Sequence, residues 1–182
     1  FYGVTYEKMG DMNHVQWPCP TLDHPGTPWL YKDNHFDTPT GKGQLFAAPW
    51  RAPAETPDAD YPLVLCTVRE VGHYSCRSMT GNCAALQSLA DEPGRVQISR
   101  ADAQQMGITD RQLVWVSSRR GKVITRADIS DRINSGAVYM TYQWWVGACN
   151  ELTQDNLDPI SKTPETKYCA VKVEAIADQR WA

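Results

Sequence analysis

The sequence predicts a mainly β fold with short helices, in which the strands close into a barrel. Short apolar or alternating segments recur between Pro62 and Ile176, and the segments between them are too short for long helices. A parallel sheet with helices on both faces needs long crossover helices, so this pattern favours a closed barrel. Nine of the 12 prolines lie in the first 62 residues, so the compact part begins near Tyr61.

Each of the six expected strands has a β-type pattern of apolar residues. They span residues 62–68, 95–98, 113–117, 122–129, 137–142 and 168–176. The alternating residues Val123, Thr125, Ala127 and Ile129 are predicted to face the barrel interior. The expected core comprises Val64, Leu65, Val96, Ile98, Val114, Val116, Ile124 and Val171.

Two short helices and one hairpin turn are expected between the strands. Ser99 followed by Asp102 is typical of a capping box, and Gly107 supplies a left-handed stop, which predicts a helix over residues 99–106. A second helix is expected over residues 82–90, followed by a turn at Pro93. The turn at residues 118–121 is expected to expose Arg119 and Arg120.

Proline and glycine divide the chain into three parts. Residues 1–50 are aromatic and lack periodicity, which predicts an irregular extended arm lying on a larger upstream part. Residues 51–60 have the composition of a linker, and residues 61–178 form the compact domain. The chain starts at Phe1 without an initiator Met or a targeting peptide, so we expect a fragment.

Charge and composition exclude several classes of partner. The chain has 18 basic and 21 acidic residues and a net charge of −3, so nothing favours nucleic acid or an anionic membrane, and any anion site must be local. No apolar stretch approaches the roughly 20 residues that cross a bilayer. The 6 cysteines show no C-x-x-C spacing, so we expect reduced, buried thiols and a cytoplasmic protein.

The densest polar cluster, residues 67–82, follows the first strand. It contains two arginines, one histidine and several hydroxyls next to a helix start, as expected of an anion cradle. A solvated loop whose arginines pair with Glu70 is the alternative. Residues 141–153 form a second cluster, in which Trp144 and Trp145 either stack on a heterocycle or form a hydrophobic plug under a loop.

Motifs for nucleophilic catalysis, zinc proteases and phosphate loops are absent from the sequence. The histidines are scattered along the chain. Cys19 and His24 form a weak metal-like pair that is better explained as two loop residues of the arm.

The order of several motifs resembles one known family. In the domain these motifs are residues 63–69 (LVLCTVR), 96–103 (VQISRADA), 119–121 (RRG) and 150–153 (NELT); in the arm they are residues 15–20 (VQWPCP), 24–28 (HPGTP) and 38–43 (TPTGKG). Together they resemble the C-terminal molybdopterin-dinucleotide-binding domain of the large molybdenum or tungsten oxidoreductases. The resemblance covers nearly the whole chain and points to formate dehydrogenases of the formate hydrogenlyase-linked type.

This resemblance implies a double-psi β-barrel and a bis-(molybdopterin guanine dinucleotide) cofactor carrying Mo or W. It places nine residues of the chain against the dinucleotide: Arg69, Glu70, His73, Tyr74, Ser75, Tyr142, Gln143, Asn150 and Lys167. These types suit a ligand with a pyrophosphate and amide-like ring edges.

The resemblance also implies roles that lie outside this chain. The metal ligand, the residues that act on formate and an iron–sulfur cluster would lie upstream, so we expect no catalysis by the fragment alone. Its partners would be the upstream domains and electron-transfer subunits. The alternatives are the same domain from a nitrate reductase or an NAD-linked formate dehydrogenase, or a β-barrel that binds a ligand without redox chemistry.

Overall fold

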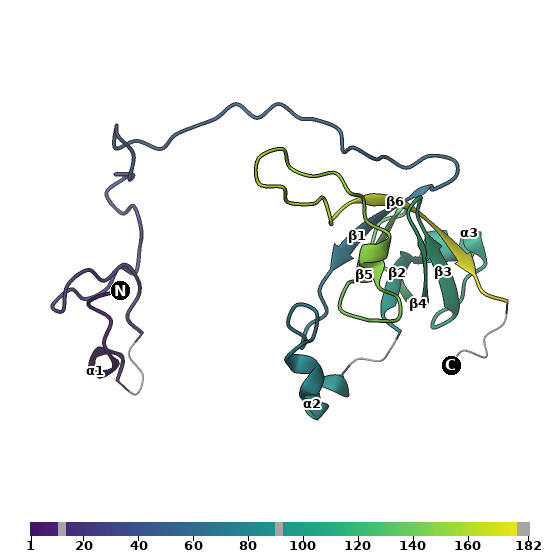
Figure 1. Ribbon diagram of the computed structural model, residues 1–182, viewed down its shortest axis with the longest axis horizontal. Coiled ribbons are helices and arrows are strands. Elements are labelled where there is room, and N and C mark those ends of the chain that lie inside the picture. Colours follow the sequence, from purple (N-terminus) through teal and green to yellow (C-terminus); the bar gives the residue numbers. More distant parts are fainter. Residues whose placement is uncertain (11–13, 90–92, 178–182) are drawn as a thin grey trace. The chain divides into compact units, whose positions relative to one another are not determined.

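The chain forms two compact units in the computed structural model, which describes residues 1–10, 14–89 and 93–177 (Figure 1). The first unit spans Phe1–Trp50 and the second spans Arg51–Ala182. Two predicted boundaries, the helix end at Ala90 and the domain end at Asp178, lie outside the described residues.

The second unit contains a closed barrel with the strand order β1-β5-β2-β4-β3-β6 (Figure 1). Its strands are β1 (Leu63–Val68), β2 (Arg95–Ser99), β3 (Leu113–Ser117), β4 (Lys122–Ser130), β5 (Ala137–Thr141) and β6 (Cys169–Ala175). The pairs β1–β5 and β2–β4 are parallel, and the other four pairs are antiparallel. The predicted closed mixed barrel is therefore confirmed, while its double-psi connection stays a prediction.

The barrel core follows the two-residue period of a strand. Leu65, Val96, Ile98, Val114, Val116 and Val171 are buried, as predicted. Val64 and Ile124 were expected in the core but are only half-buried. Their neighbours Leu63 and Val123 point inward instead, and a residue one position along a strand faces the opposite side.

The helix α3 (Arg100–Met106) begins where the sequence predicts, because Ser99 Oγ accepts a hydrogen bond from Asp102 N over 3.1 Å. Gly107, with φ of 66°, ends it in the left-handed conformation. The Asp102 carboxylate also bonds outside the helix. It accepts hydrogen bonds from Ser135 Oγ and, over 2.8 Å, from Gly136 N, and so ties α3 to the turn before β5.

The other predicted helix is wrong in length. Residues 82–90 do not form one helix: η1 covers Thr80–Asn82, and α2 covers only Ala84–Gln87. Cys83 lies between them with φ of −99° and ψ of 109°, an extended conformation that interrupts the helical path. The short helix η2 (Cys149–Glu151) was not predicted.

Strand direction brings several connecting segments to one end of the barrel. β1 and β5 are parallel with Val68 beside Thr141, so the segments that follow both strands emerge together. β6 runs antiparallel to β1, so the segment before β6 joins them, and Thr67 Oγ1 donates to Thr166 O over 2.7 Å. We call this the loop end; α3 lies at the opposite end (Figure 1).

The first unit has little regular structure, as predicted: α1 (Tyr6–Met9) is its only helix or strand among the described residues. It is organised around the buried Cys19, whose backbone O accepts from Gly3 N over 2.9 Å and whose thiol donates to His24 O over 3.2 Å. Lys8 Nζ donates to the same carbonyl over 2.7 Å. Cys19 and His24 thus contact each other as loop residues.

The cysteines differ in burial. All six are free, and Cys19, Cys149 and Cys169 are buried as expected. Burial raises the pKa of the Cys149 thiol to about 12 and that of Cys169 to about 11. Cys76 and Cys83 are exposed, so the expectation of buried thiols is wrong for both. Among the described residues, no three potential ligands gather for a metal ion, and no helix is long and apolar enough to cross a membrane.

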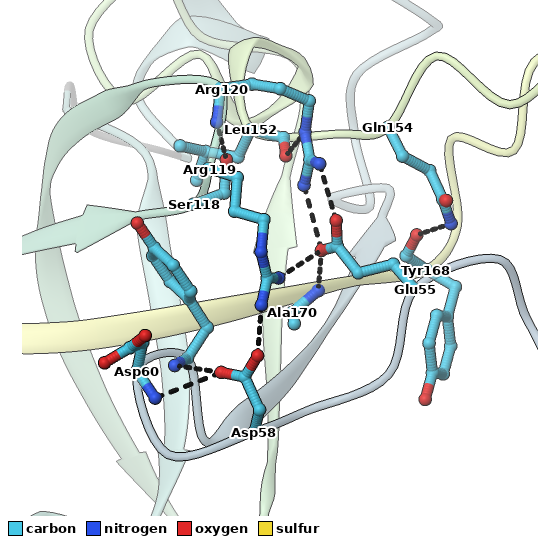
Figure 2. A network of polar contacts seen from close by, with 11 residues as sticks. Glu55, Asp58, Asp60, Ser118, Arg119, Arg120, Leu152, Gln154, Tyr168 and Ala170 are labelled. Carbon is cyan, nitrogen blue, oxygen red and sulfur yellow. Dashed lines mark hydrogen bonds and ion pairs between the residues drawn. The ribbon is translucent and has the colours of Figure 1, made fainter.

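Part of the segment with linker composition is fixed to the barrel by Glu55 (Figure 2). The Glu55 carboxylate accepts from Arg120 Nη1 over 2.6 Å, from Arg120 Nη2 over 3.0 Å and from Ala170 N of β6 over 2.6 Å. Arg120 Nε also donates to Leu152 O over 2.9 Å. Arg119 pairs with Asp58 and lies over the Tyr61 ring, 4.8 Å from its centre.

The turn at residues 118–121 is therefore not a free surface turn. Arg119 and Arg120 are exposed residues, as predicted, but the Arg120 side chain is only 25% exposed because it pairs with Glu55, whose side chain is only 12% exposed. Its partner is 65 residues away in the sequence, and no local pattern could reveal the pair. The pairing joins the chain before β1, the β3–β4 turn, the segment after η2 and the start of β6.

Replacing Glu55 with glutamine should destabilise the barrel. The hydrogen bond from Arg120 is the main reason that the pKa of Glu55 lies below its ordinary value of 4.5. Charge-assisted hydrogen bonds of this kind stabilise by about 1.5–3 kcal/mol, so Glu55→Gln should lower the free energy of unfolding by about that amount at pH 7. Chemical denaturation followed by tryptophan fluorescence measures the difference.

The difference in the free energy of unfolding between wild type and Glu55→Gln should depend on pH. A carboxyl group with a lowered pKa in the folded state stabilises fully above its unfolded pKa, and the effect is lost as the pH falls through the folded value. The gap between wild type and Glu55→Gln should thus close below about pH 4.5. Asp131→Asn, which breaks the exposed pair with Arg100, should change little. Equal effects of the two substitutions at pH 7 would contradict this assignment.

Candidate functional site

Three segments at the loop end bring most of the predicted binding residues together. They are residues 69–80 after β1, residues 142–146 after β5 and residues 165–168 before β6. Lys167 Nζ donates to Thr67 O over 2.8 Å, which holds the third segment against the end of β1. Glu70 N donates to Gln143 Oε1 over 2.6 Å, which joins the first two.

Two cations lie near the Tyr142 ring. The Arg69 guanidinium carbon is 5.5 Å from the ring centre and the Lys167 ammonium is 5.6 Å from it. Both side chains belong to exposed residues, and neither forms an ion pair with a carboxylate in the described part of the chain. Cations over an aromatic face keep their charge for an incoming ligand, so this arrangement can bind an anion.

Gln143 shapes the loop after β1. Gln143 is buried, with only 3% of the residue exposed. Its Nε2 donates to His73 O over 3.0 Å, and its Oε1 accepts from Glu70 N. Both ends of the amide are therefore engaged by loop backbone. The physical contribution of Gln143 is to hold residues 70–73 in one conformation.

Trp144 fills the space beneath the same loop. Trp144 is only 3% exposed. Its Nε1 donates to Glu70 Oε2 over 3.1 Å, and the Arg77 guanidinium lies 3.9 Å from the centre of its ring. A side chain on Gly94 would collide with the Trp144 ring, so only glycine allows this close approach. The interpretation as a hydrophobic plug is confirmed for Trp144 and is wrong for Trp145, which is 85% exposed.

His73 lies within this packed cluster. Its Nδ1 is 2.9 Å from Thr80 Oγ1, and its ring packs edge-on against Trp144 at 5.8 Å between centres. Its Nε2 is buried and has no hydrogen-bond partner among the described residues. A buried imidazole nitrogen without a partner is costly, and a polar ligand atom would satisfy it.

Tyr74, Ser75 and Asn150 are less closely tied to this cluster. Tyr74 is 67% exposed, and its backbone N donates to Thr80 Oγ1 over 3.2 Å. Ser75 has φ of 47°, a left-handed conformation that is uncommon for serine and that turns the loop sharply. Asn150 is exposed in η2, and its carbonyl accepts from Thr153 Oγ1 over 2.9 Å.

A pocket of about 260 Å³ lies beside Arg69, against the outer wall of the barrel. We call it the wall pocket; it is lined by Val68, Arg69, Glu70, Val71, Arg95, Gln97, Asp128, Tyr139 and Thr141. Sequence reasoning did not group its strand residues because they lie on four different strands, β1, β2, β4 and β5. The available signal was the outward phase of the alternation in β2, which places Arg95 and Gln97 on one face.

These residues fit a phosphate-containing ligand with polar ring edges. The loop end offers guanidinium and ammonium donors at Arg69 and Lys167, an unsatisfied imidazole nitrogen at His73, and a buried Thr141 hydroxyl without a partner among the described residues. Guanidinium groups form forked hydrogen bonds to phosphate oxygens, and hydroxyl and imidazole groups complete such sites.

The closed barrel and the polar site at its loop end are typical of a domain that binds a cofactor. The family described as Molydopterin dinucleotide binding domain matches residues 63–170, so the chain belongs to that family. The family resemblance recognised in the sequence motifs is thereby confirmed.

Two curated relatives match over almost the whole chain. Formate dehydrogenase H of Escherichia coli is 64% identical over 184 residues, covering 100% of this chain and 26% of that protein. F420-dependent formate dehydrogenase 1 subunit alpha of Methanococcus maripaludis is 42% identical over 178 residues, covering 97% of this chain and 26% of that protein. The chain thus spans about a quarter of the length of these relatives.

One solved structure shows a similar fold. Acetylene hydratase from Pelobacter acetylenicus has a TM-score of 0.62 with 18% sequence identity, over 79% of this chain and 25% of that chain. At this identity the likeness concerns the fold alone.

Gln143→Leu should loosen the loop after β1 while leaving the barrel folded. Leucine keeps the volume but leaves Glu70 N and His73 O without their partner, a loss of about 1–3 kcal/mol for an unsatisfied buried group. Hydrogen exchange followed by mass spectrometry should show faster exchange in residues 69–80. Gln112→Leu, which removes a hydrogen bond to Thr109 N, should leave that segment unchanged. Unchanged exchange in Gln143→Leu would contradict the positioning role.

Proposed function

We propose that this chain is the dinucleotide-binding part of a formate dehydrogenase that oxidises formate to carbon dioxide. The observation that carries the proposal is the likeness to formate dehydrogenases along the whole chain, including the arm as well as the barrel. The loop end supports it, since it holds cations without a carboxylate partner and buried polar atoms without a hydrogen-bond partner among the described residues, which suit a pyrophosphate-containing ligand.

The ligand that we propose is bis-(molybdopterin guanine dinucleotide) with Mo or W. Arg69 and Lys167 would hold phosphate oxygens, and His73 and Ser75 would complete the contact, with Tyr142, Tyr74 and Asn150 lining it. Glu70 and Gln143 shape this surface through the contacts that join them to Trp144 and to the loop backbone. When bound, the metal of this cofactor supplies the redox chemistry, and the residues of this chain bind and orient the group.

The partners belong to the same proposal. The relatives are about four times longer than this chain, which supports an upstream part of the same polypeptide as the first partner. Electron-transfer subunits would be further partners of the full enzyme. A cytoplasmic location is supported by the free state of all six cysteines.

Cofactor retention in the full-length polypeptide tests the proposal. Arg69→Ala and His73→Ala should each lower dinucleotide affinity by about ten- to a hundredfold, since a desolvated charge-assisted hydrogen bond contributes about 1.5–3 kcal/mol. Arg69→Lys should recover only part of this, because lysine keeps the charge but loses the fork. Pterin content per polypeptide after gel filtration measures the retention.

The matched control is Arg100→Ala, which removes an exposed arginine at the opposite end of the barrel. It should retain the cofactor as the wild type does. Equal pterin content in all variants would contradict the assigned role of the loop after β1. A wild-type enzyme that reduces nitrate and does not oxidise formate would contradict the proposed substrate while keeping the binding role.

A further inference from the structure

A lysine and a cysteine lie side by side in the first unit. Lys8 Nζ, from α1, is 3.9 Å from Cys19 Sγ, although the two residues are 11 positions apart in the sequence. Both groups donate to one acceptor, His24 O, over 2.7 Å from Lys8 Nζ and over 3.2 Å from the Cys19 thiol. A single carbonyl therefore holds an amine and a thiol in contact.

The backbone around this pair holds the sulfur in place. A side chain on Gly3 would come within 2.6 Å of Cys19 Sγ, so glycine is needed for the backbone to cover the sulfur this closely. Thr27 Oγ1 donates to Pro18 O over 2.6 Å, which ties the segment after His24 to the residue before Cys19. The sulfur is thus fixed, and Lys8, on its flexible four-carbon stem, is the group that can move toward it.

Burial limits what can react with the Cys19 sulfur. Cys19 is 0% exposed, whereas Lys8 is half-buried. Cys19 is also the only cysteine among residues 1–50, so no second thiol is present in this unit. A bulky thiol such as glutathione is kept away from a buried sulfur, whereas hydrogen peroxide is little larger than water. A sulfenic acid formed here would have the Lys8 amine as the nucleophile in contact with it.

We propose that Lys8 and Cys19 form a modification site at which hydrogen peroxide produces a reversible N–O–S crosslink. In the first step the Cys19 sulfur attacks one peroxide molecule and breaks its O–O bond. The products are a sulfenic acid at Cys19 and one water molecule. The sulfur has then lost two electrons, which the peroxide has gained.

The second step joins nitrogen to the sulfenic oxygen. Lys8 Nζ releases its ammonium proton to solvent and bonds to this oxygen while a second peroxide molecule accepts two electrons from the nitrogen. One hydrogen from the amine and one from the sulfenic hydroxyl leave with that peroxide as two water molecules. Overall, one thiol, one ammonium and two peroxide molecules give the crosslink, three water molecules and one proton.

The crosslink has two consequences for the first unit. It closes a covalent loop between α1 and Cys19, and a crosslink of this kind restricts the unfolded chain. It also protects the sulfur, because a sulfenic acid that is not captured proceeds to sulfinic acid, which is not reduced by thiols. Dithiothreitol should reverse the crosslink, since four electrons and four protons return the thiol, the amine and one water molecule.

Peptide mass spectrometry of the full-length polypeptide after hydrogen peroxide treatment tests the proposal. A protease that cuts before aspartate separates Lys8 from Cys19 at Asp11. The two peptides should nevertheless travel as one species, whose mass is their sum plus one oxygen atom less two hydrogen atoms. Dithiothreitol should abolish this species. Oxidation of Met9 adds an oxygen atom without joining the peptides, so it cannot imitate the crosslink.

The informative variant is Lys8→Arg, which keeps the cation beside Cys19 but replaces the amine with a guanidinium that is a poor nucleophile. It should lose the crosslinked species completely and accumulate Cys19 as sulfinic acid, which dithiothreitol does not restore. The matched control is Lys32→Arg, at an exposed lysine of the same unit, which should crosslink as the wild type does. Equal thermal unfolding midpoints of the two variants show that the comparison concerns the chemistry.

The wild-type spectrum decides the question even if Lys8→Arg fails to fold. Finding Cys19 in the treated wild type only as an unmodified thiol, or only as sulfinic or sulfonic acid, would show that the inference is wrong. A crosslinked species that persists in Lys8→Arg would assign the nitrogen to another residue and also contradict it. None of these outcomes bears on dinucleotide binding, so the proposed function is tested separately.

Discussion

The parallel pairing of β1 with β5 is the constraint on which the loop end depends. Residues 69–80 and 142–146 are more than 60 residues apart in the sequence, and they meet because their strands end side by side. Gln143 then joins them with two hydrogen bonds, and Trp144 packs beneath the loop against Gly94. A loop with strained backbone at Ser75 and Arg77 keeps a single conformation because these contacts determine it. The barrel thus positions the surface at which we propose that the ligand binds.

Local charge explains how an acidic chain can bind an anionic ligand. The net charge is −3, yet three acidic side chains of the second unit are engaged by other partners. Glu55 and Asp58 pair with Arg120 and Arg119, and the Glu70 carboxylate accepts the Trp144 N–H. Arg69 and Lys167 lie over Tyr142 instead of pairing with a carboxylate within the described residues. Because these carboxylates are engaged elsewhere, Arg69 and Lys167 keep positive charge available at the loop end.

Several features of the site could be predicted from the sequence and others could not. The polar cluster after β1 was visible because its arginines, histidine and hydroxyls are adjacent in the chain. The contacts within it were not visible, since only the structure shows that the Gln143 amide bonds Glu70 N and His73 O. Arg95 and Asp128 gave no local signal, because residues on separate strands meet only through register. The pairing of Arg120 with Glu55 was missed for the same reason, since Glu55 is distant in the sequence.

By itself the sequence determined the number and approximate bounds of the strands, the closed mixed barrel, the cap and stop of α3, the irregular arm and the family. These depend on local patterns: the two-residue alternation of strands, the capping serine, the glycine stop, and motifs that are continuous in the chain. Only the tertiary structure decided the phase of β1 at Val64, the division of the predicted α2 helix, the attachment of Glu55 and the walls of the pocket beside Arg69. Each of these arises where separate strands or loops meet, and long-range contacts of that kind are specified by packing and register instead of local pattern.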